Sequence, residues 1–511
     1  MLFCGRSRYQ VPVANTDSKL RHHLSVFFSG GVLTLSKLVV GFIRIKYVSF
    51  VLGTVGVGFI SQAGQMQLLG ISLGSLSMAA GVVNRMGAPE NRLPDGERRL
   101  LSTAFTVQLA ASLLVVLVAL IGVGSFSTLV FSEASPLART AFIAVALSIP
   151  FSVVSAGYAD AVLFGLMRYD LYVRAGIATA VVGTAVTLLL ISVWGLPGAF
   201  WGMCAMSVLN CTFDVIAVSR ARSFREMFRI GFDWIEARAL VKYCFVMLVA
   251  GVVNYLSRLW IQARVIADVG VDANGLLHVP LAITSYYTPF LTAALWGRLH
   301  PAVTKTGDSP EGRHELAIAL RLTALVATTV IVTVLSLDRL LVRLAYSPQF
   351  LPATSLLPVQ LVGDLSYFVA VTFSVYVLGT SRLRVYLSGW AVYYAAVAVV
   401  SIELIPSLGV GAVPMGYTIT TTMLGAVSLV WFIRESQGED ISRTLLSVLG
   451  CFGVVVVQAV LNAYGLLPAL QFLIAGVMIA TMLRVFLSKE HGLRSLRAML
   501  GLETATVEPV D

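Results

Sequence analysis

Charged residues are scarce in this sequence. Asp, Glu, Lys and Arg together make up 12% of the 511 residues, whereas hydrophobic residues make up 57%. Soluble domains carry about 25% charged residues and about 45–50% apolar ones. A chain with so little charge cannot cover its apolar surface with a water-compatible exterior, so the composition excludes an ordinary soluble globular fold.

Cysteine is also rare, and the usual catalytic motifs are missing. The sequence contains no G-x-x-x-x-G-K-[ST] loop for ATP hydrolysis and no Cys/His cluster with the spacing of a metal site. We therefore expect no cofactor, no metal and no enzymatic activity. Five cysteines without paired spacing are interpreted as small apolar residues, at Cys4, Cys204, Cys211, Cys244 and Cys451.

Long apolar blocks separated by short polar loops fill the sequence instead. A helix needs roughly 20 apolar residues to cross the bilayer core. The blocks are continuous rather than alternating, which argues against a transmembrane β-barrel. The sequence predicts an all-α polytopic membrane protein with about fourteen transmembrane helices, at 25–46, 57–83, 101–123, 140–164, 173–194, 197–219, 242–265, 277–297, 316–337, 352–378, 384–405, 411–433, 443–464 and 466–487.

The basic residues are distributed unevenly about these spans. Of the 36 lysines and arginines, 28 lie in or beside the two tails and the even-numbered loops. The positive-inside rule then predicts that both termini are cytoplasmic and that the first span is retained as a signal anchor. The net charge of +10 is thus a topology signal, and it does not indicate a nucleic-acid partner.

The first six predicted spans recur weakly as the next six. Two six-helix halves that run in the same direction are typical of a transporter whose substrate passes between two rocking lobes. The matches have an offset of 217 for Gly53/Gly270 and Gly58/Gly275, and of 214 for Gly165/Gly379, Arg168/Arg382, Tyr172/Tyr386, Gly195/Gly409 and Gly202/Gly416.

The repeat divides the chain into six parts. They are a cytoplasmic tail (1–24), an N-lobe (25–219), an amphipathic cytoplasmic linker (220–241), a C-lobe (242–434), a helical hairpin (435–488) and a second cytoplasmic tail (489–511). As a helix, the linker would place Phe224 and Trp234 on one face and Arg225 and Glu236 on the other. We expect such a strip to lie flat on the membrane surface; the alternative is an ordinary solvated linker.

Three charged residues lie deep inside predicted spans. Lys37 is in the first span, Arg258 in the seventh and Asp364 in the tenth. A charge in hydrocarbon is costly unless it faces water or a partner, so we expect these side chains to line a cleft between the lobes. The alternative is a structural ion pair of Asp364 with Arg258 or Lys37.

Further polar residues lie nearer the ends of the spans. Arg85 and Arg298, at the predicted cytoplasmic mouth, could collect an anionic headgroup or merely set topology. We expect Asp160 to pair with Arg168, and Arg44 to reach the outer interface by snorkelling. Sugar contacts are conceivable for Gln62, Gln65 and Tyr286, although helix packing is slightly favoured for them.

Two stretches resemble a known family. The segment LGTVGVGFISQAGQMQLLGISLGSLSMAAGVVNRMGAPE resembles the first loop and second helix of Wzx-type O-antigen translocases. The segment LVAGVVNYLSRLWIQARVIADVGVDANGLLHVPLAITSYYTPFLTAALWGRLHP is similar to the corresponding part of the second lobe. These translocases are lipid-linked oligosaccharide flippases of the multidrug/oligosaccharidyl-lipid/polysaccharide superfamily, and the resemblance covers residues 25–434.

The resemblance implies a flippase for surface polysaccharide (O-antigen) biosynthesis in the bacterial inner membrane. It would move an undecaprenyl-diphosphate-linked oligosaccharide to the outer leaflet by alternating access, with a glycan polymerase and a chain-length regulator as partners. Lys37, Arg258, Arg85 and Arg298 would hold the diphosphate. Coupling to a proton or sodium gradient would require a carboxylate, for which the candidates include Asp364 and Asp160.

Two rival functions remain. A cation-coupled multidrug antiporter of the same superfamily would be expected to have an acidic cavity, whereas basic residues dominate the deep positions here. A membrane-embedded glycan polymerase or ligase would need larger outer loops than this sequence offers.

Overall fold

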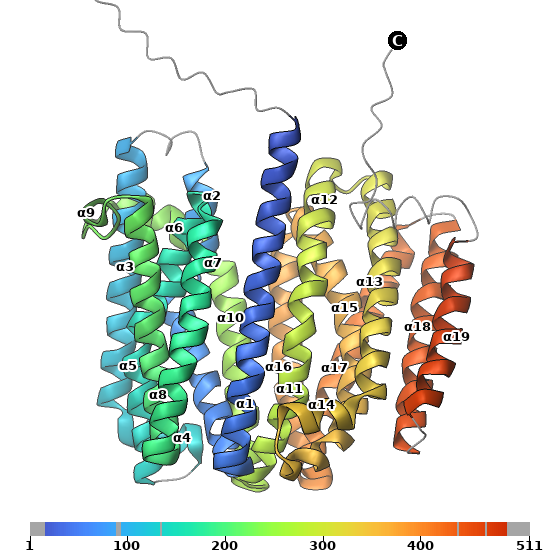
Figure 1. Cartoon of the computed structure of the whole chain (residues 1–511). Coiled ribbons are helices and arrows are strands. Elements are labelled where there is room, and N and C mark those ends of the chain that lie inside the picture. The colour runs from blue at the N-terminus through green and yellow to red at the C-terminus, as the bar shows by residue number, and fades with distance from the viewer. Residues whose placement is uncertain (1–15, 88–93, 133–134, 437–438, 465–467, 488–511) are drawn as a thin grey trace, which may run out of the picture.

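The computed structural model describes residues 16–87, 94–132, 135–436, 439–464 and 468–487, and the regular structure in these ranges is helical (Figure 1). The π-helical segments are η2 (Val153–Ala159), η3 (Thr179–Gly183) and η4 (Leu295–Leu299), and the 3-10 segments are η5 (Pro348–Leu356) and η6 (Gly409–Gly411). In chain order the α-helices are α1 (Thr16–Ser75), α2 (Ala79–Met86), α3 (Pro94–Ile121), α4 (Val123–Phe131), α5 (Pro136–Ser152), α6 (Asp160–Gly165), α7 (Tyr169–Ala178), α8 (Thr184–Ala221), α9 (Phe224–Met227), α10 (Trp234–Asp268), α11 (Val271–Ala294), α12 (His300–Thr306), α13 (Pro310–Ser336), α14 (Asp338–Ala345), α15 (Leu357–Gly379), α16 (Leu383–Leu408), α17 (Ala412–Glu435), α18 (Glu439–Ala463) and α19 (Pro468–Leu487).

The predicted spans overlap these helices. Among the described residues, nine helical stretches are long and apolar enough to cross a membrane. Tyr169–Ala221 and Leu383–Glu435 each contain two of the predicted spans, and Leu33–Ser75 overlaps two. The all-helical membrane class is therefore confirmed, and the number fourteen stays a prediction.

Glycines turn the chain sharply where two spans merge. Gly53 (φ 63°) interrupts α1, Gly195 (φ 62°) interrupts α8, and Gly409 (φ 54°) follows α16. Side chains strongly disfavour positive φ, whereas glycine adopts it readily, so these positions allow a helix to reverse within very few residues. All three belong to the glycine matches of the sequence repeat.

The repeat is also present in the backbone at the other end of the helices. Met167 (φ 56°) and Ser381 (φ 60°) are 214 residues apart and both are left-handed. The next residue in each case donates to an equivalent carbonyl, Arg168 N to Leu163 O at 2.9 Å and Arg382 N to Val377 O at 3.1 Å. The same turn therefore occurs twice, as a duplicated bundle requires.

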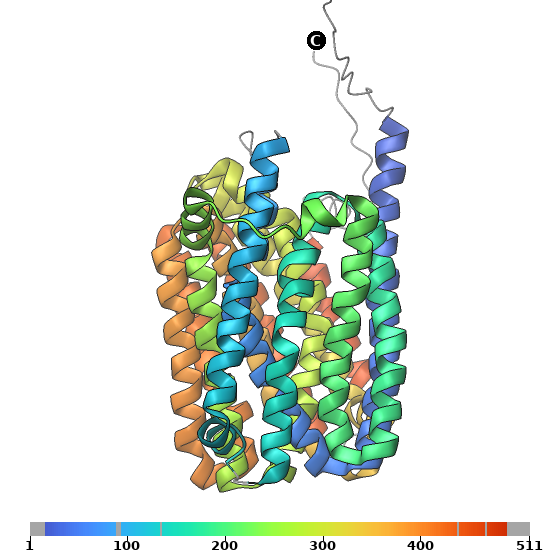
Figure 2. The same cartoon turned by 90° about the vertical axis from the view of Figure 1, so that its left-hand side faces the viewer.

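The two bundles lie side by side. Figure 1 shows α3, α5 and α8 on one side and α13, α15 and α17 on the other, with α1 and α11 between them. Figure 2 shows the N-terminal bundle from its outer side, with α1 running along one edge. The hairpin α18–α19 packs on α13, where Gln458 donates to Ser336 Oγ at 2.8 Å and to Gln471 Oε1 at 2.9 Å.

The linker differs from its prediction. Only Phe224–Met227 is helical before α10 begins, so the expected amphipathic strip does not form as one helix. Phe228 instead packs against Phe105 and Tyr158, with ring centroids 5.4 and 5.6 Å apart. Backbone hydrogen bonds from the linker to Thr103 and Thr106 hold the following residues out of helical geometry.

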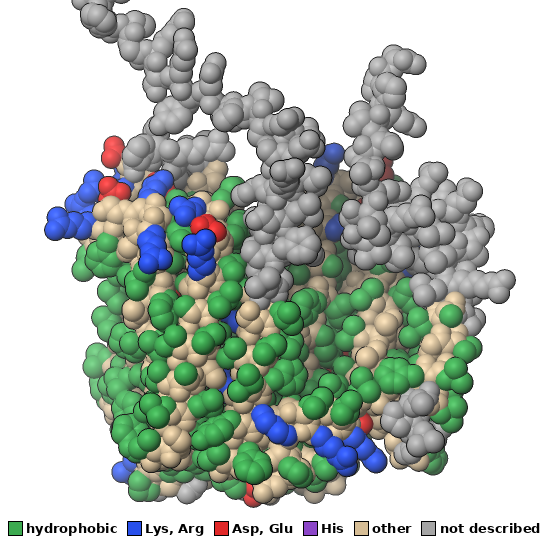
Figure 3. Space-filling view, in the orientation of Figure 1, with side chains coloured by type: hydrophobic (Ala, Val, Ile, Leu, Met, Phe, Trp, Pro, Cys, Tyr) green, Lys and Arg blue, Asp and Glu red, His purple; other side chains and the backbone are tan. Residues whose placement is uncertain are grey.

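The outer surface fits a lipid environment. Figure 3 shows hydrophobic side chains over the middle of the molecule, with Lys and Arg gathered over the upper ends of the helices and a smaller group at the lower end. Exposed leucine, valine, isoleucine and aromatic side chains occur along most of the long helices. The protein is a multi-pass membrane protein, and α1 starts and α19 ends at the same, upper face (Figure 1).

Candidate functional site

The two lobes meet closely at their lower ends. A Cβ atom on Gly275 would lie 2.0 Å from the Thr54 carbonyl oxygen, and one on Gly58 would lie 2.3 Å from the Val271 carbonyl oxygen. Asn274 Nδ2 donates to the Gly58 carbonyl at 2.8 Å, and the Thr54 hydroxyl donates to Asp272. The repeat-related pair Gly58 and Gly275 thus permits backbone contact between α1 and α11.

A chain of three hollows lies above this contact. The N-lobe hollow, of about 350 Å³, is lined by Lys37 and Arg44, and the middle hollow, of about 600 Å³, by Arg44 and Arg258. The C-lobe hollow, of about 320 Å³, is lined by Arg258. Because Arg44 and Arg258 each border two hollows, the three form one central cavity. Each of the three hollows is within the size range of small-molecule sites, about 300–1,000 Å³.

Three cations face the central cavity. Lys37, Arg44 and Arg258 are all solvent-exposed, and within the described ranges none of them has a carboxylate at ion-pair distance. Arg258 Nε donates to Asn254 Oδ1 at 3.0 Å, and the Lys37 ammonium lies 5.8 Å from the centre of the Tyr172 ring. The cavity therefore carries positive charge that a ligand can neutralise.

Sequence reasoning missed Arg44 as a cavity residue. The prediction ended the first span at 46 and assigned Arg44 to the outer interface. In the structure α1 continues to the corner at Gly53, so Arg44 stays inside the bundle. The spacing from Lys37 was the available signal, because residues seven apart lie on one face of a helix.

Asp364 does not pair with a cation. It is fully buried and accepts hydrogen bonds from Thr284 (2.8 Å), Tyr417 (2.8 Å) and Gln360 (3.5 Å), and also from the Tyr287 hydroxyl. Uncharged donors occupy the carboxylate oxygens, which removes the need for Arg258. The alternative of an Arg258–Asp364 or Lys37–Asp364 ion pair is therefore wrong.

The predicted pair of Asp160 with Arg168 is also wrong. Arg168 Nε lies 3.1 Å from Asp170 Oδ1, at the exposed start of α7. Asp160 is half-buried and lies within electrostatic reach of Asp214 and Lys37.

Arg85 and Arg298 lie away from the central cavity. Arg85 Nη2 forms an ion pair with Glu236 Oε2 at 2.8 Å, which joins α2 to α10. Arg298 is in η4, beside Glu315, and its Nη1 is buried without a hydrogen-bond partner among the described residues. Neither arginine lines any of the three hollows.

The residues named for sugar contacts separate into two groups. Gln62 is fully buried and donates to the carbonyls of Val130 (2.5 Å) and Leu259 (3.2 Å), which is a helix-packing role. Gln65 and Tyr286 line the middle hollow, where the Tyr286 ring stacks on Phe42 with centroids 5.3 Å apart.

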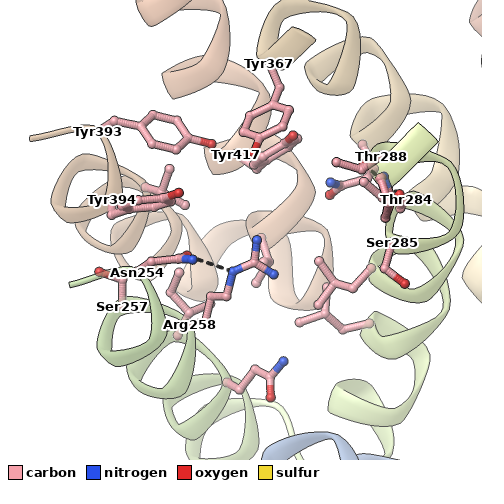
Figure 4. A pocket seen from close by; sticks show the side chains of 18 residues that line it. Asn254, Ser257, Arg258, Thr284, Ser285, Thr288, Tyr367, Tyr393, Tyr394 and Tyr417 are labelled. Atoms are coloured by element: carbon pink, nitrogen blue, oxygen red, sulfur yellow. Dashed lines mark hydrogen bonds between the residues drawn. The ribbon is translucent and has the colours of Figure 1, made fainter. Parts of the chain in front are cut away.

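Four tyrosines of the C-lobe hollow were not predicted. Figure 4 shows Tyr367, Tyr393, Tyr394 and Tyr417 around a space into which Arg258 points. They come from α15, α16 and α17 and are spread over 51 residues of sequence. The adjacent pair Tyr393–Tyr394 inside a predicted span was the only local signal.

Comparison with known proteins agrees with this architecture. The family model described as polysaccharide biosynthesis protein matches residues 65–355, more than half of the chain. The chain belongs to this family. Among curated proteins, none matches it.

Solved structures share the fold at low sequence identity. The lipid II flippase MurJ in an inward closed conformation superposes with a TM-score of 0.62 at 14% identity, over 93% of this chain and 99% of that one. An inward-facing MATE family multidrug transporter of the MOP superfamily gives 0.58 at 13% identity, over 80% and 94%. An outward-facing MATE transporter gives 0.52 at 12% identity, over 80% and 95%.

These likenesses confirm the predicted fold, and the family model agrees with the predicted link to polysaccharide biosynthesis. The structural neighbours are described as a lipid II flippase and as multidrug transporters. The protein is accordingly a polytopic membrane protein of the polysaccharide biosynthesis family with a MurJ/MATE-like fold.

Proposed function

We propose that the protein moves an undecaprenyl-diphosphate-linked oligosaccharide from the inner to the outer leaflet of the bacterial inner membrane, for surface polysaccharide such as O-antigen. Both termini would be cytoplasmic, and a glycan polymerase and a chain-length regulator would use the product. The observation that carries the proposal is the central cavity with its three cations, Lys37, Arg44 and Arg258, which have no ion-pair partner in the described part of the chain.

A diphosphate suits these cations. Arginine can engage two phosphate oxygens at once, whereas lysine acts as a point charge. Arg44 and Arg258 both border the middle hollow, so a diphosphate there would meet both guanidinium groups. The polyprenyl tail would remain in the bilayer while the polar glycan occupies the cavity.

The contact below the cavity suggests how access could alternate. The lobes would have to break the Asn274–Gly58 and Thr54–Asp272 hydrogen bonds to open the lower end. Asp364 is a candidate for the coupling proton, because three of its donors, Thr284, Gln360 and Tyr417, also line the C-lobe hollow. Asp160, close to Lys37, is the N-lobe candidate.

The multidrug antiporter is less compatible with this cavity. Binding an organic cation would call for acidic or purely aromatic walls. Among the residues that line the three hollows in the described structure there is no Asp or Glu, and three are cations. A glycan polymerase or ligase is less compatible with the transporter fold.

Binding of undecaprenyl diphosphate to the purified full chain in nanodiscs tests the proposal. A charge-assisted hydrogen bond is worth about 1.5–3 kcal/mol, so we expect Arg258→Ala and Arg44→Ala each to weaken binding by roughly tenfold or more. Arg258→Lys should recover part of the loss. Arg384→Ala removes an exposed arginine that does not line the cavity and should bind normally.

Flipping of the same lipid in proteoliposomes, measured beside membrane abundance, separates binding from folding. Normal abundance with lost flipping in Arg258→Ala supports the proposal. Unchanged affinity and unchanged flipping in both arginine variants would contradict it.

A further inference from the structure

The C-lobe hollow has the composition of a carbohydrate site. Figure 4 shows Tyr393, Tyr394 and Asn254 on one side of it and Thr284, Ser285 and Thr288 on the facing side, with the Arg258 guanidinium between them. A sugar has an apolar C–H face and a rim of hydroxyls. Its recognition needs flat apolar surface with polar groups at the edge, and tyrosine provides both in one side chain.

Trp390 holds three of the four tyrosines in place from behind. Its buried ring stacks on Tyr394 with centroids 5.5 Å apart, and it meets Tyr393 at 5.4 Å and Tyr367 at 5.9 Å edge to face. Tyr417 is fixed separately, because its hydroxyl donates to Asp364 at 2.8 Å. The aromatic wall is therefore packed before a ligand arrives, which lowers the entropy cost of binding.

Three hydroxyls of this wall are free to bind a ligand. Within the described residues, those of Tyr367, Tyr393 and Tyr394 form no hydrogen bond, although each belongs to a half-buried or buried side chain. A tyrosine hydroxyl can both donate and accept. Hydroxyls of a sugar ring would satisfy these groups, whereas an alkyl chain would leave them without partners at a cost in affinity.

The charge of the C-lobe hollow argues against an organic cation as its ligand. Tyrosine rings also bind organic cations. Here Arg258 lines the same space and no carboxylate of the described residues lines it, so a second cation would be repelled. A neutral or anionic ligand with many hydroxyls is the better fit.

The position of the C-lobe hollow beside the middle hollow determines which part of the substrate it would hold. It shares Arg258, Leu281 and Ser285 with the middle hollow, where Arg44 also lies. A diphosphate on the two arginines would direct its first sugar across Arg258 into the tyrosine wall. This step rests on the proposed function.

We propose that the C-lobe hollow is a saccharide subsite for the pyranose next to the diphosphate. The ring lies against Tyr394 and its hydroxyls bond to Tyr367, Tyr393 and Asn254. The subsite lets the protein distinguish a sugar-bearing lipid from the bare carrier, which the cations alone cannot do.

The test compares bare undecaprenyl diphosphate with the same lipid carrying one N-acetylglucosamine or one galactose, bound to the full chain in nanodiscs. Tryptophan fluorescence is a second readout, since Trp390 contacts the wall. We expect at least one sugar-bearing lipid to bind roughly tenfold more tightly than the bare one, as two or three hydrogen bonds would give. Tyr367→Phe/Tyr393→Phe should abolish that preference, because both rings stay and both hydroxyls leave.

Tyr386→Phe is the matched control. Tyr386 lies on α16 and contacts Trp390 at 6.4 Å, but it does not line the hollow, so the preference should remain. Equal binding of all three lipids by the unaltered chain, or a preference that survives in the double variant, overturns the subsite and leaves the diphosphate proposal standing. Failure of every lipid to bind overturns both. Tyr394→Ala, which removes the stacking surface, should also lose the preference.

Discussion

The N-lobe and the C-lobe have the same frame but different cavity walls. The corner glycines Gly195 and Gly409 and the left-handed turns after α6 and α15 recur at a spacing of 214 residues. At the same spacing, Tyr393 and Tyr394 of the C-lobe hollow correspond to Thr179 and Ala180, and Trp390 behind them corresponds to Gly176. Gly176, Thr179 and Ala180 all line the N-lobe hollow.

The small side chains of the N-lobe make room for a cation. A Cβ atom on Gly176 would lie 3.5 Å from Lys37 Cε and 2.9 Å from Leu33 Cδ1, so the lysine stem passes where the C-lobe places an indole ring. The comparison teaches that the duplicated scaffold sets where the cavity lies, while the residues on its two walls divide the ligand chemistry, charge on one side and aromatic surface on the other.

The largest difference between the lobes should appear at their buried carboxylates. Asp364→Ala leaves three hydroxyls and an amide without their acceptor, whereas Asp214→Ala leaves the Ser155 hydroxyl. An unsatisfied buried group costs about 1–3 kcal/mol, so we expect a loss of about 3 kcal/mol or more for Asp364→Ala and about 1 kcal/mol for Asp214→Ala. Thermal unfolding of the purified variants measures both. Equal losses would show that the two carboxylates are held alike.

A second difference should appear at equivalent glycines. A Cβ on Gly416 would lie 2.4 Å from Ser401 Oγ and 2.8 Å from Ser401 Cα, whereas one on Gly202 would lie 2.8 Å from Thr187 Cγ2 and 3.3 Å from Thr187 Cα. We expect Gly416→Ala to lower stability by about 2 kcal/mol, and Gly202→Ala by less, because overpacking is worse against backbone.

Gly389→Ala is the control for these glycines, since nothing lies within 4 Å of the added atom. It should leave the melting temperature unchanged or raise it. A larger loss of stability in Gly202→Ala than in Gly416→Ala would contradict this expectation.

The smallest difference concerns the arginines of the repeated turn. Arg168 pairs only locally with Asp170, whereas Arg382 pairs with Asp308, which also binds Arg313 (3.2 Å) and Tyr376 (2.8 Å). Burial alone would raise the pKa of Asp308, but the hydrogen bonds from Tyr376 and Arg313 and the two positive charges lower it below the usual 3.8. Its contribution is therefore complete above about pH 4 and is lost as the pH falls through the lowered pKa.

Asp308→Asn should cost about 0.5–1 kcal/mol at pH 7, and this deficit should shrink as the pH falls below the ordinary pKa of 3.8. Asp170→Asn should have no measurable effect at either pH, because that pair is largely exposed. Urea or thermal unfolding at several pH values provides the comparison. A deficit for Asp308→Asn that does not change with pH would rule out the charge as its cause.

The sequence was sufficient for the features that depend on local pattern. The lengths of the apolar runs predicted the positions of the helices. Glycines such as Gly53 and Gly195 marked the corners, because glycine readily adopts the positive φ required there. Lys37 and Arg258 were placed in a cleft because a charge in hydrocarbon needs one.

The predictions that were wrong or missing concern contacts between segments that are distant in the sequence. Asp364 found hydroxyl donors on α11 and α17 instead of Arg258, and the linker was unwound by Phe105 and Tyr158 of the N-lobe. The tyrosine wall is assembled from three helices, and no spacing along the chain reveals which of their faces converge. Burial of one segment against another decides such features, and a single sequence does not specify it.

The corner glycines also set how the molecule can deform. At Gly53, Gly195 and Gly409 the two arms of a hairpin are joined with almost no intervening chain, so neither arm can slide along the other without breaking the turn. At the upper face the connection from α8 to α10 spans residues 222–233, with one short helix inside it. The connections between helices are therefore tight at the glycine corners and longer at the upper face. Motion of the lobes should resemble the tilting of stiff, paired rods, with compliance concentrated at the face where both chain-terminal helices lie.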